Sequence, residues 1–96
     1  MNKLRNESID RLFKAIMMLE DIDQCYDFFE DICTIKEVQD MAQRLDTAIL
    51  LDEGMSYQNI AQKVGVSTAT IGRVGKCLNY GGGGYKLVID KLRADK

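Results

Sequence analysis

The sequence predicts an all-α protein of about six helices, and two observations carry that prediction. All eight glycines lie between Gly54 and Gly84 and the chain has no proline, so its first 53 residues contain no strong helix breaker. Apolar residues recur at helical spacing, and no window alternates for long enough to indicate a strand. We therefore expect a mostly helical first half, followed by shorter helices separated by glycine-containing turns.

Two helices are expected before residue 33. The first has one apolar face with the i, i+3, i+4, i+7, i+8 spacing. That face contains Ile9, Leu12, Phe13, Ile16 and Met17. The second is expected from about Asp23 to Ile32, with Tyr26 and Phe29 pointing inward.

A longer helix begins at a capping box that runs from Thr34 to Glu37. In such a box the threonine hydroxyl accepts a free backbone N–H and the glutamate reaches back to another. Gly54 is expected to end this helix as its C-terminal cap. Its apolar stripe contains Val38, Met41, Ala42, Leu45 and Ile49. A final helix carries Tyr85, Val88, Ile89 and Leu92 on one face.

Length and composition exclude several classes of protein. A chain of 96 residues is one small domain, and because it buries only part of its surface alone we expect a homodimer. Three cysteines without CxxC spacing and no histidine argue against a metal site or a disulfide framework, and fit a cytoplasmic protein. The N-terminal MNKLRNESIDR has no continuous apolar run, so neither signal peptide nor membrane span is expected. No catalytic constellation is visible, so neither enzymatic activity nor a cofactor is expected.

The charge is divided unevenly along the chain. Residues 1–55 contain six Lys/Arg and thirteen Asp/Glu, a net charge of −7. Residues 56–96 contain seven Lys/Arg and two Asp, a net charge of +5. The segment 56–85 has no acidic residue at all. This division is compatible with a polyanionic partner for the second half or with a modestly basic solvated surface.

The segment YQNIAQKVGVSTATIGRVGK, residues 57–76, predicts a helix-turn-helix. Ala61 is small where two helices would cross, and Gly65 tolerates the positive φ of the turn. Ser56 and Ser67 stand where each helix needs an N-cap. The positions that would fill the core between the helices are Ile60, Val64, Val66, Ile71 and Val74. An ordinary αα-hairpin would share this pattern, but a solvated hairpin would carry acidic side chains as well.

In a helix-turn-helix the second helix enters the major groove of DNA. Thr68 and Ala69 could offer methyl groups to thymine, whereas Lys63 and Lys76 would bind phosphates. Gly72 faces outward, where a missing side chain allows close approach to DNA. The residues expected to contact DNA are Gln58, Lys63, Ser67, Thr68, Ala69, Thr70, Gly72, Arg73 and Lys76.

The glycine run GGGGYK, residues 81–86, lacks the Gly-Lys-Ser/Thr ending of a phosphate-binding loop, and no strand precedes it. We expect it to end the recognition helix at about Asn79 and to return the chain into the last helix. Tyr80 and Tyr85 on either side are expected to pack against the dimer core, with stacking on a base or a sugar as the alternative. For Gly75, close packing is the only role that the sequence suggests.

The run LLDEGMSYQNIAQKVGVSTATIGRVGKCL, with TIKEVQDMAQRL upstream, resembles the bacterial Trp repressor superfamily, in particular its TrpR-related YerC/YecD proteins. The resemblance covers roughly residues 8 to 92. It implies an intertwined homodimer whose protomers each present a helix-turn-helix. On this basis residues 1–96 form a single Trp-repressor-like domain. Its expected parts are a helical dimerisation core over 8–53, the helix-turn-helix over 56–78, and a linker with C-terminal helix over 80–94.

The resemblance also concerns a ligand pocket. Arg44 and Arg73 match two arginines that flank the bound tryptophan in Trp repressor. The glycine beside the indole is Val74 here, and a serine near the amino group is Cys77. We therefore expect Val74 to fill the space of the indole. Gln58 matches a DNA-contacting arginine of the family, which weakens its own expected contact.

The leading functional hypothesis is a DNA-binding transcriptional regulator, specifically a repressor, that binds double-stranded DNA as a homodimer and without tryptophan. One alternative is a ligand-gated regulator with a small-molecule effector between Arg44 and Arg73. The other is an adaptor that keeps the helix-turn-helix fold but binds a protein.

Overall fold

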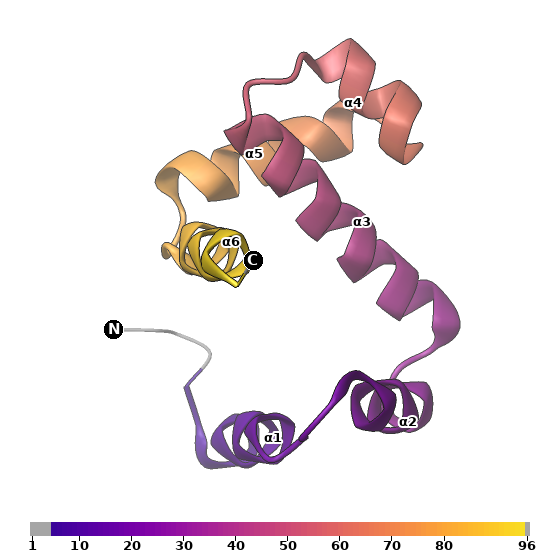
Figure 1. Ribbon diagram of the computed structural model, residues 1–96, viewed down its shortest axis with the longest axis vertical. Helices are drawn as coiled ribbons and strands as arrows, with labels where there is room; N and C mark the ends of the chain where they lie inside the picture. Colours follow the sequence, from indigo (N-terminus) through magenta and orange to yellow (C-terminus); the bar gives the residue numbers. More distant parts are fainter. Residues whose placement is uncertain (1–4, 96) are drawn as a thin grey trace. The chain divides into compact units, whose positions relative to one another are not determined.

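The computed structural model describes residues 5–95, and its regular structure there is entirely helical (Figure 1). This part of the chain contains six helices and no strand, which confirms the predicted all-α fold. The helices are α1 (Glu7–Met17), α2 (Ile22–Ile32), α3 (Ile35–Asp52), α4 (Tyr57–Val64), α5 (Thr68–Tyr80) and α6 (Gly84–Ala94). No helix between residues 5 and 95 is both long enough and apolar enough to cross a lipid bilayer.

The helix ends form where the sequence predicts caps. The Thr34 N–H donates to Glu37 Oε1 at 2.8 Å, and the Glu37 N–H donates to Thr34 Oγ1 at 3.1 Å, so the capping box is present. The pKa of the Glu37 carboxyl is held below its ordinary value, first by the hydrogen bond from the Thr34 backbone N–H and second by a hydrogen bond from the Thr34 side chain. Gly54 has a φ of +90° after the end of α3. Its N–H donates to the Leu51 carbonyl at 3.0 Å, which gives the predicted C-terminal cap.

The described residues divide into two compact units, one up to Val38 and one from Gln39. In the first unit α1 and α2 contain no buried residue. Tyr26 is 70% exposed, so its predicted inward orientation is wrong within this chain. The expected apolar face of α1 is only partly covered, because Phe13 and Met17 are exposed. Within residues 5–95 about half of Phe13 and most of Met17 and Tyr26 thus remain uncovered.

The second unit has a core where α3, α5 and α6 meet. Ala48, Val74 and Ile89 are its buried members, one from each helix. On α3 the buried residues are Thr47 and Ala48 rather than the predicted apolar stripe. Thr47 can be buried because its hydroxyl donates to the Gln43 carbonyl at 2.7 Å.

The stripe predicted on α3 and the face predicted on α6 are both incompletely covered. Met41 and Ala42 of that stripe are exposed. On α6 only Ile89 is buried and Tyr85 half-buried, while Val88 and Leu92 are exposed. The four residues lie on one face of α6, as predicted, but only part of that face is covered within the described chain.

An ion-pair cluster fixes α6 to the end of α3. Asp52 accepts from Lys86 Nζ at 3.0 Å and from Arg93 Nη1 at 2.6 Å. The hydrogen bond from Lys86, followed by the one from Arg93, holds the pKa of the Asp52 carboxyl below its ordinary value. The cluster joins Asp52 to Lys86, which is 34 positions later in the sequence, and to Arg93, which is 41 positions later.

Candidate nucleic-acid interface

The helices α4 and α5 form a helix-turn-helix. Ser56 caps α4 by accepting the Asn59 N–H at 3.2 Å, and Ser67 caps α5 by accepting the Thr70 N–H at 3.1 Å. Gly65 ends α4 in the left-handed conformation, with φ +85°. Ile60 of α4 and Ile71 of α5 are completely buried. The caps and the turn therefore lie where the sequence predicts them. Of the predicted core, Val64 and Val66 are only half-buried, and Val74 is buried against α3 and α6.

The close approach of Tyr57 to Gly75 was not predicted. A Cβ atom at residue 75 would lie 3.3 Å from the Tyr57 hydroxyl and 3.6 Å from Leu51 Cδ1. Gly75 is buried, so a side chain here would contact Leu51 and require the Tyr57 hydroxyl to move by a few tenths of an ångström. In the sequence, the only indication of this contact is a glycine within a predicted helix, where no turn requires one. The contact indicates that Tyr57 of α4 helps to position α5, a role that the sequence does not predict.

The N-terminal half of α5 presents the predicted DNA-facing residues. Ser67, Thr68, Ala69 and Arg73 are exposed, and Lys76 follows one turn later. Positions four apart lie one above the other on a helix, so these residues share a continuous surface. That surface combines hydroxyl groups, a methyl group and two cations.

Thr70 and Gly72 are half-buried members of the predicted set. The Thr70 hydroxyl accepts a hydrogen bond from the Ser67 hydroxyl at 3.1 Å. Thr70 thus participates in the cap that begins α5 as well as bordering its outer surface.

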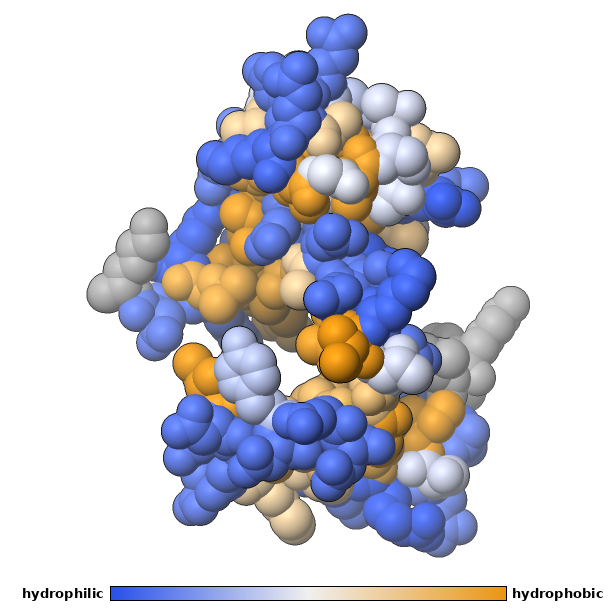
Figure 2. Space-filling model, turned by 90° about the vertical axis from the view of Figure 1, so that its right-hand side faces the viewer, coloured by the Kyte–Doolittle hydropathy of each residue, from blue (hydrophilic) through white to orange (hydrophobic). Residues whose placement is uncertain are grey.

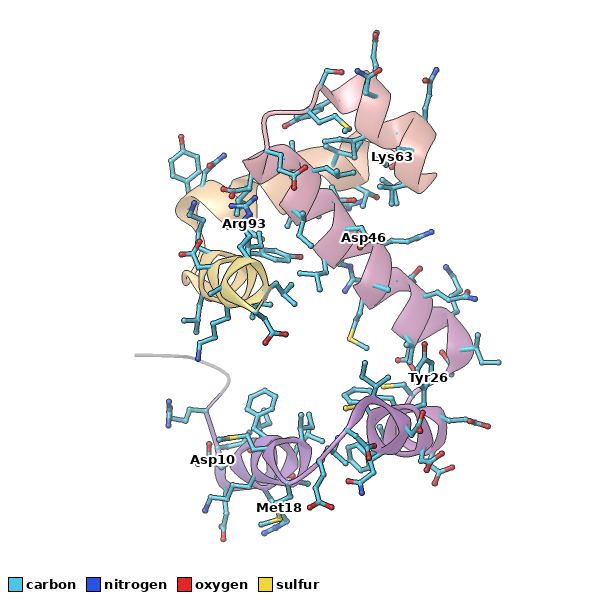
Figure 3. The ribbon with its side chains drawn as sticks, in the orientation of Figure 1. Asp10, Met18, Tyr26, Asp46, Lys63 and Arg93 are labelled. Atoms are coloured by element: carbon cyan, nitrogen blue, oxygen red, sulfur yellow. The ribbon has the colours of Figure 1, made fainter. Side chains whose placement is uncertain are left out.

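On α4, Gln58 is exposed near the start of the helix and Lys63 near its end. Lys63 also lines a groove of about 320 Å³ between α3 and α4, together with Gln43, Asp46, Ile49, Leu50 and Val64. Figure 3 labels Lys63 and Asp46 on the two helices. In Figure 2, where α4 lies in the upper part of the view, apolar side chains are visible between hydrophilic ones.

The cations of this region are not neutralised by the chain itself. Lys63, Arg73 and Lys76 make no ion pair with any residue from 5 to 95. No acidic residue occurs between residues 56 and 85. An uncompensated positive surface of this kind attracts polyanions.

Val74, the residue expected to fill the space of the indole, is a buried core residue. Its side chain is 4% exposed and packs with Ala48 and Ile89. Arg44 and Arg73 are both exposed. Burial raises the pKa of Tyr85, whereas the positive charge of Arg44 lowers it, which places Arg44 in the electrostatic range of that phenol.

The glycine run joins α5 to α6. Helix α5 ends at Tyr80, one residue later than predicted. A Cβ at Gly81 would collide with the Cys77 carbonyl, and Gly83 has a φ of +87°. Tyr85 is half-buried against the core, as expected. Tyr80 is 85% exposed in the single chain, and its packing against the core of a dimer stays a prediction.

The chain is similar to known proteins over almost its whole length. Residues 7–93 match the family profile of the Trp repressor protein. It is 48% identical over 92 residues to the uncharacterized protein YerC of Bacillus subtilis (strain 168), covering 96% of this chain and 88% of YerC.

Two solved structures share its fold. A TrpR-like protein from Eubacterium eligens ATCC 27750 superimposes with a TM-score of 0.91 at 49% identity, covering 96% of this chain and 95% of that one. A candidate Trp repressor from Staphylococcus aureus also has a TM-score of 0.91, at 43% identity over 95% and 91% of the two chains. The matched family is one of transcription regulators rather than of enzymes. The chain therefore belongs to the Trp repressor family.

Proposed function

We propose that this protein is a cytoplasmic transcriptional repressor that binds specific double-stranded DNA sites as a homodimer. The observation that carries the proposal is the outer surface of α4 and α5. It combines a correctly capped helix-turn-helix with cations that no described residue neutralises. In the proposed complex the start of α5 enters the major groove, and its hydroxyl and methyl groups read base edges.

Each of the predicted contact residues has a part in this proposal. Arg73, Lys76 and Lys63 bind phosphates, which supplies affinity and makes it dependent on salt. Thr68 and Ala69 meet the bases. The remaining contacts come from Gln58, Ser67, Thr70 and Gly72.

The homodimer follows from the side chains that the chain leaves uncovered. Phe13, Met17, Ile22 and Tyr26 of α1 and α2 are all at least half exposed. Exposure of this extent indicates an interface, and a second copy would bury these groups. We assign residues 8–53 to this dimerisation core, 56–78 to the DNA-binding part and 80–94 to the linker and last helix of a single domain. The two DNA-binding parts would then meet half-sites about one helical turn apart.

We further propose that DNA binding needs no tryptophan. The burial of Val74 supports this, because a valine side chain is packed into the core at the position where the family resemblance expects a glycine beside the indole. The same packing fixes α5 against α3 and α6 without a ligand. A thermal-shift screen against amino acids and related metabolites tests the point. Stabilisation by a compound, lost in Arg44→Ala and Arg73→Ala, would replace this view with a ligand-gated regulator.

Binding-site selection from a random duplex library tests the main proposal. We expect enrichment of a two-fold symmetric site with half-sites about one turn apart. In solution the molar mass should be twice the 10.9 kDa of the chain. No enrichment and no duplex binding at low salt would reject DNA binding. In that case a stoichiometric protein partner without DNA would identify the chain as an adaptor.

A further inference from the structure

Gly72 lies in the middle of α5 and has no internal reason to be glycine. Its φ is not positive, unlike that of Gly54, Gly65 and Gly83. Apart from the backbone of α5 and the residues beside it in the chain, no described atom lies within 4 Å of the position that its Cβ would take. Because glycine is a poor helix former, alanine would make α5 more stable. Among the described residues, neither packing nor backbone conformation therefore requires a glycine at residue 72.

Gly75, one turn later, shows what an internally required glycine looks like. Its missing Cβ makes room for the Tyr57 hydroxyl and for Leu51. Gly75 is buried, whereas Gly72 borders the outer surface of α5. Gly75 therefore faces the interior of the fold, whereas Gly72 borders its outer surface.

The surroundings of Gly72 indicate what approaches it. Thr68 and Lys76 lie one turn before and after it on the same stripe, and Arg73 is adjacent. A helix with its side chains is about 10–12 Å wide, close to the roughly 12 Å width of the major groove. A side chain on the facing surface therefore limits how deeply the helix can enter.

We infer that Gly72 is a specificity-determining residue that lets the backbone of α5 approach the base edges closely. This inference rests on the proposed DNA-binding function. The short side chains of Thr68 and Ala69 reach base edges only when the helix lies deep in the groove. Arg73 and Lys76 have long, flexible side chains and keep their phosphate contacts when the helix retreats. A methyl group at residue 72 therefore weakens base reading more than phosphate binding.

The test compares Gly72→Ala with Gly82→Ala and the wild type. Gly82 is a matched control, since its Cβ position is also open, its φ is not positive and it lies outside α5. Fluorescence polarisation gives Kd for the selected duplex and for a scrambled duplex, and thermal melting gives Tm. For Gly72→Ala we expect an unchanged or higher Tm, an unchanged Kd for scrambled DNA, and a specificity ratio lowered about tenfold. For Gly82→Ala we expect the wild-type ratio.

Three results would overturn the inference. A wild-type specificity ratio in Gly72→Ala would show that close approach at this residue does not matter, while DNA binding itself stands. A lower Tm or an altered molar mass in Gly72→Ala would show that the glycine serves packing or dimerisation. Failure of the wild type to bind any duplex would reject the DNA-binding proposal, and this inference with it, before any variant is compared.

Discussion

Helix α5 carries two basic residues and α6 carries three, and the helices differ in whether an acidic side chain pairs with these charges. On α6, Lys86 and Arg93 both donate to Asp52, so their charges are compensated within the chain. On α5, Arg73 and Lys76 have no ion-pair partner among residues 5–95. This difference shows that net charge alone does not locate a binding surface. A cation holds helices together when an acid of the fold faces it, and attracts an external anion when none does.

The largest expected effect comes from reversing the uncompensated charges. In the double variant Arg73→Glu/Lys76→Glu, affinity for the selected duplex should fall by about 100-fold or more, because attraction to phosphates becomes repulsion. Polarisation titrations measure the loss. Both side chains are exposed, so Tm should stay near that of the wild type. Undiminished DNA binding would show that α5 does not face the phosphates.

The compensated charges should affect stability instead. Asp52→Asn should lower Tm at pH 7, because Lys86 and Arg93 lose their ionised partner. The pKa of Asp52 is depressed in the folded state, so its contribution is complete above the ordinary value of 3.8 and is lost as the pH falls through the lower folded value. Melting curves from pH 7 to pH 2 should therefore show the two proteins converging. A Tm difference that persists at pH 2 would indicate a role other than the charge.

The smallest expected effect concerns the N-termini of these two helices. Ser67 caps α5 through its side chain, whereas α6 begins after Gly83 without a side-chain cap. Ser67→Ala should cost about 1 kcal/mol, which lowers the Tm of a chain of this size by roughly 4–8 °C. Denaturation monitored by circular dichroism measures it. An unchanged Tm would mean that α5 is held by its packing alone.

The parts of the fold that the sequence predicted depend on local signals. The capping box at Thr34, the glycine caps at Gly54 and Gly65, and the serine caps at Ser56 and Ser67 each act within a few residues. The sequence therefore located the helix-turn-helix and its core closely. The same local information placed most of the candidate DNA-contacting residues on the outside of α5.

The parts that it missed depend on contacts between distant residues. The Asp52 cluster requires α6 to return to the end of α3, and the Tyr57–Gly75 contact requires the crossing of α4 and α5. Periodicity also identifies an apolar face without saying what covers it. For this reason the pattern predicts Tyr26 to point inward, although its side chain is 70% exposed in the described chain.

The most direct test of the central claim is the salt dependence of DNA affinity in two matched arginine variants. Arg73→Ala removes an uncompensated cation of α5, and Arg93→Ala removes a compensated cation of α6. With the selected duplex titrated at several salt concentrations, Arg73→Ala should weaken binding and reduce the slope of log K against log salt by about 1. Arg93→Ala should leave both unchanged. Equal slopes in the two variants and the wild type would contradict the account.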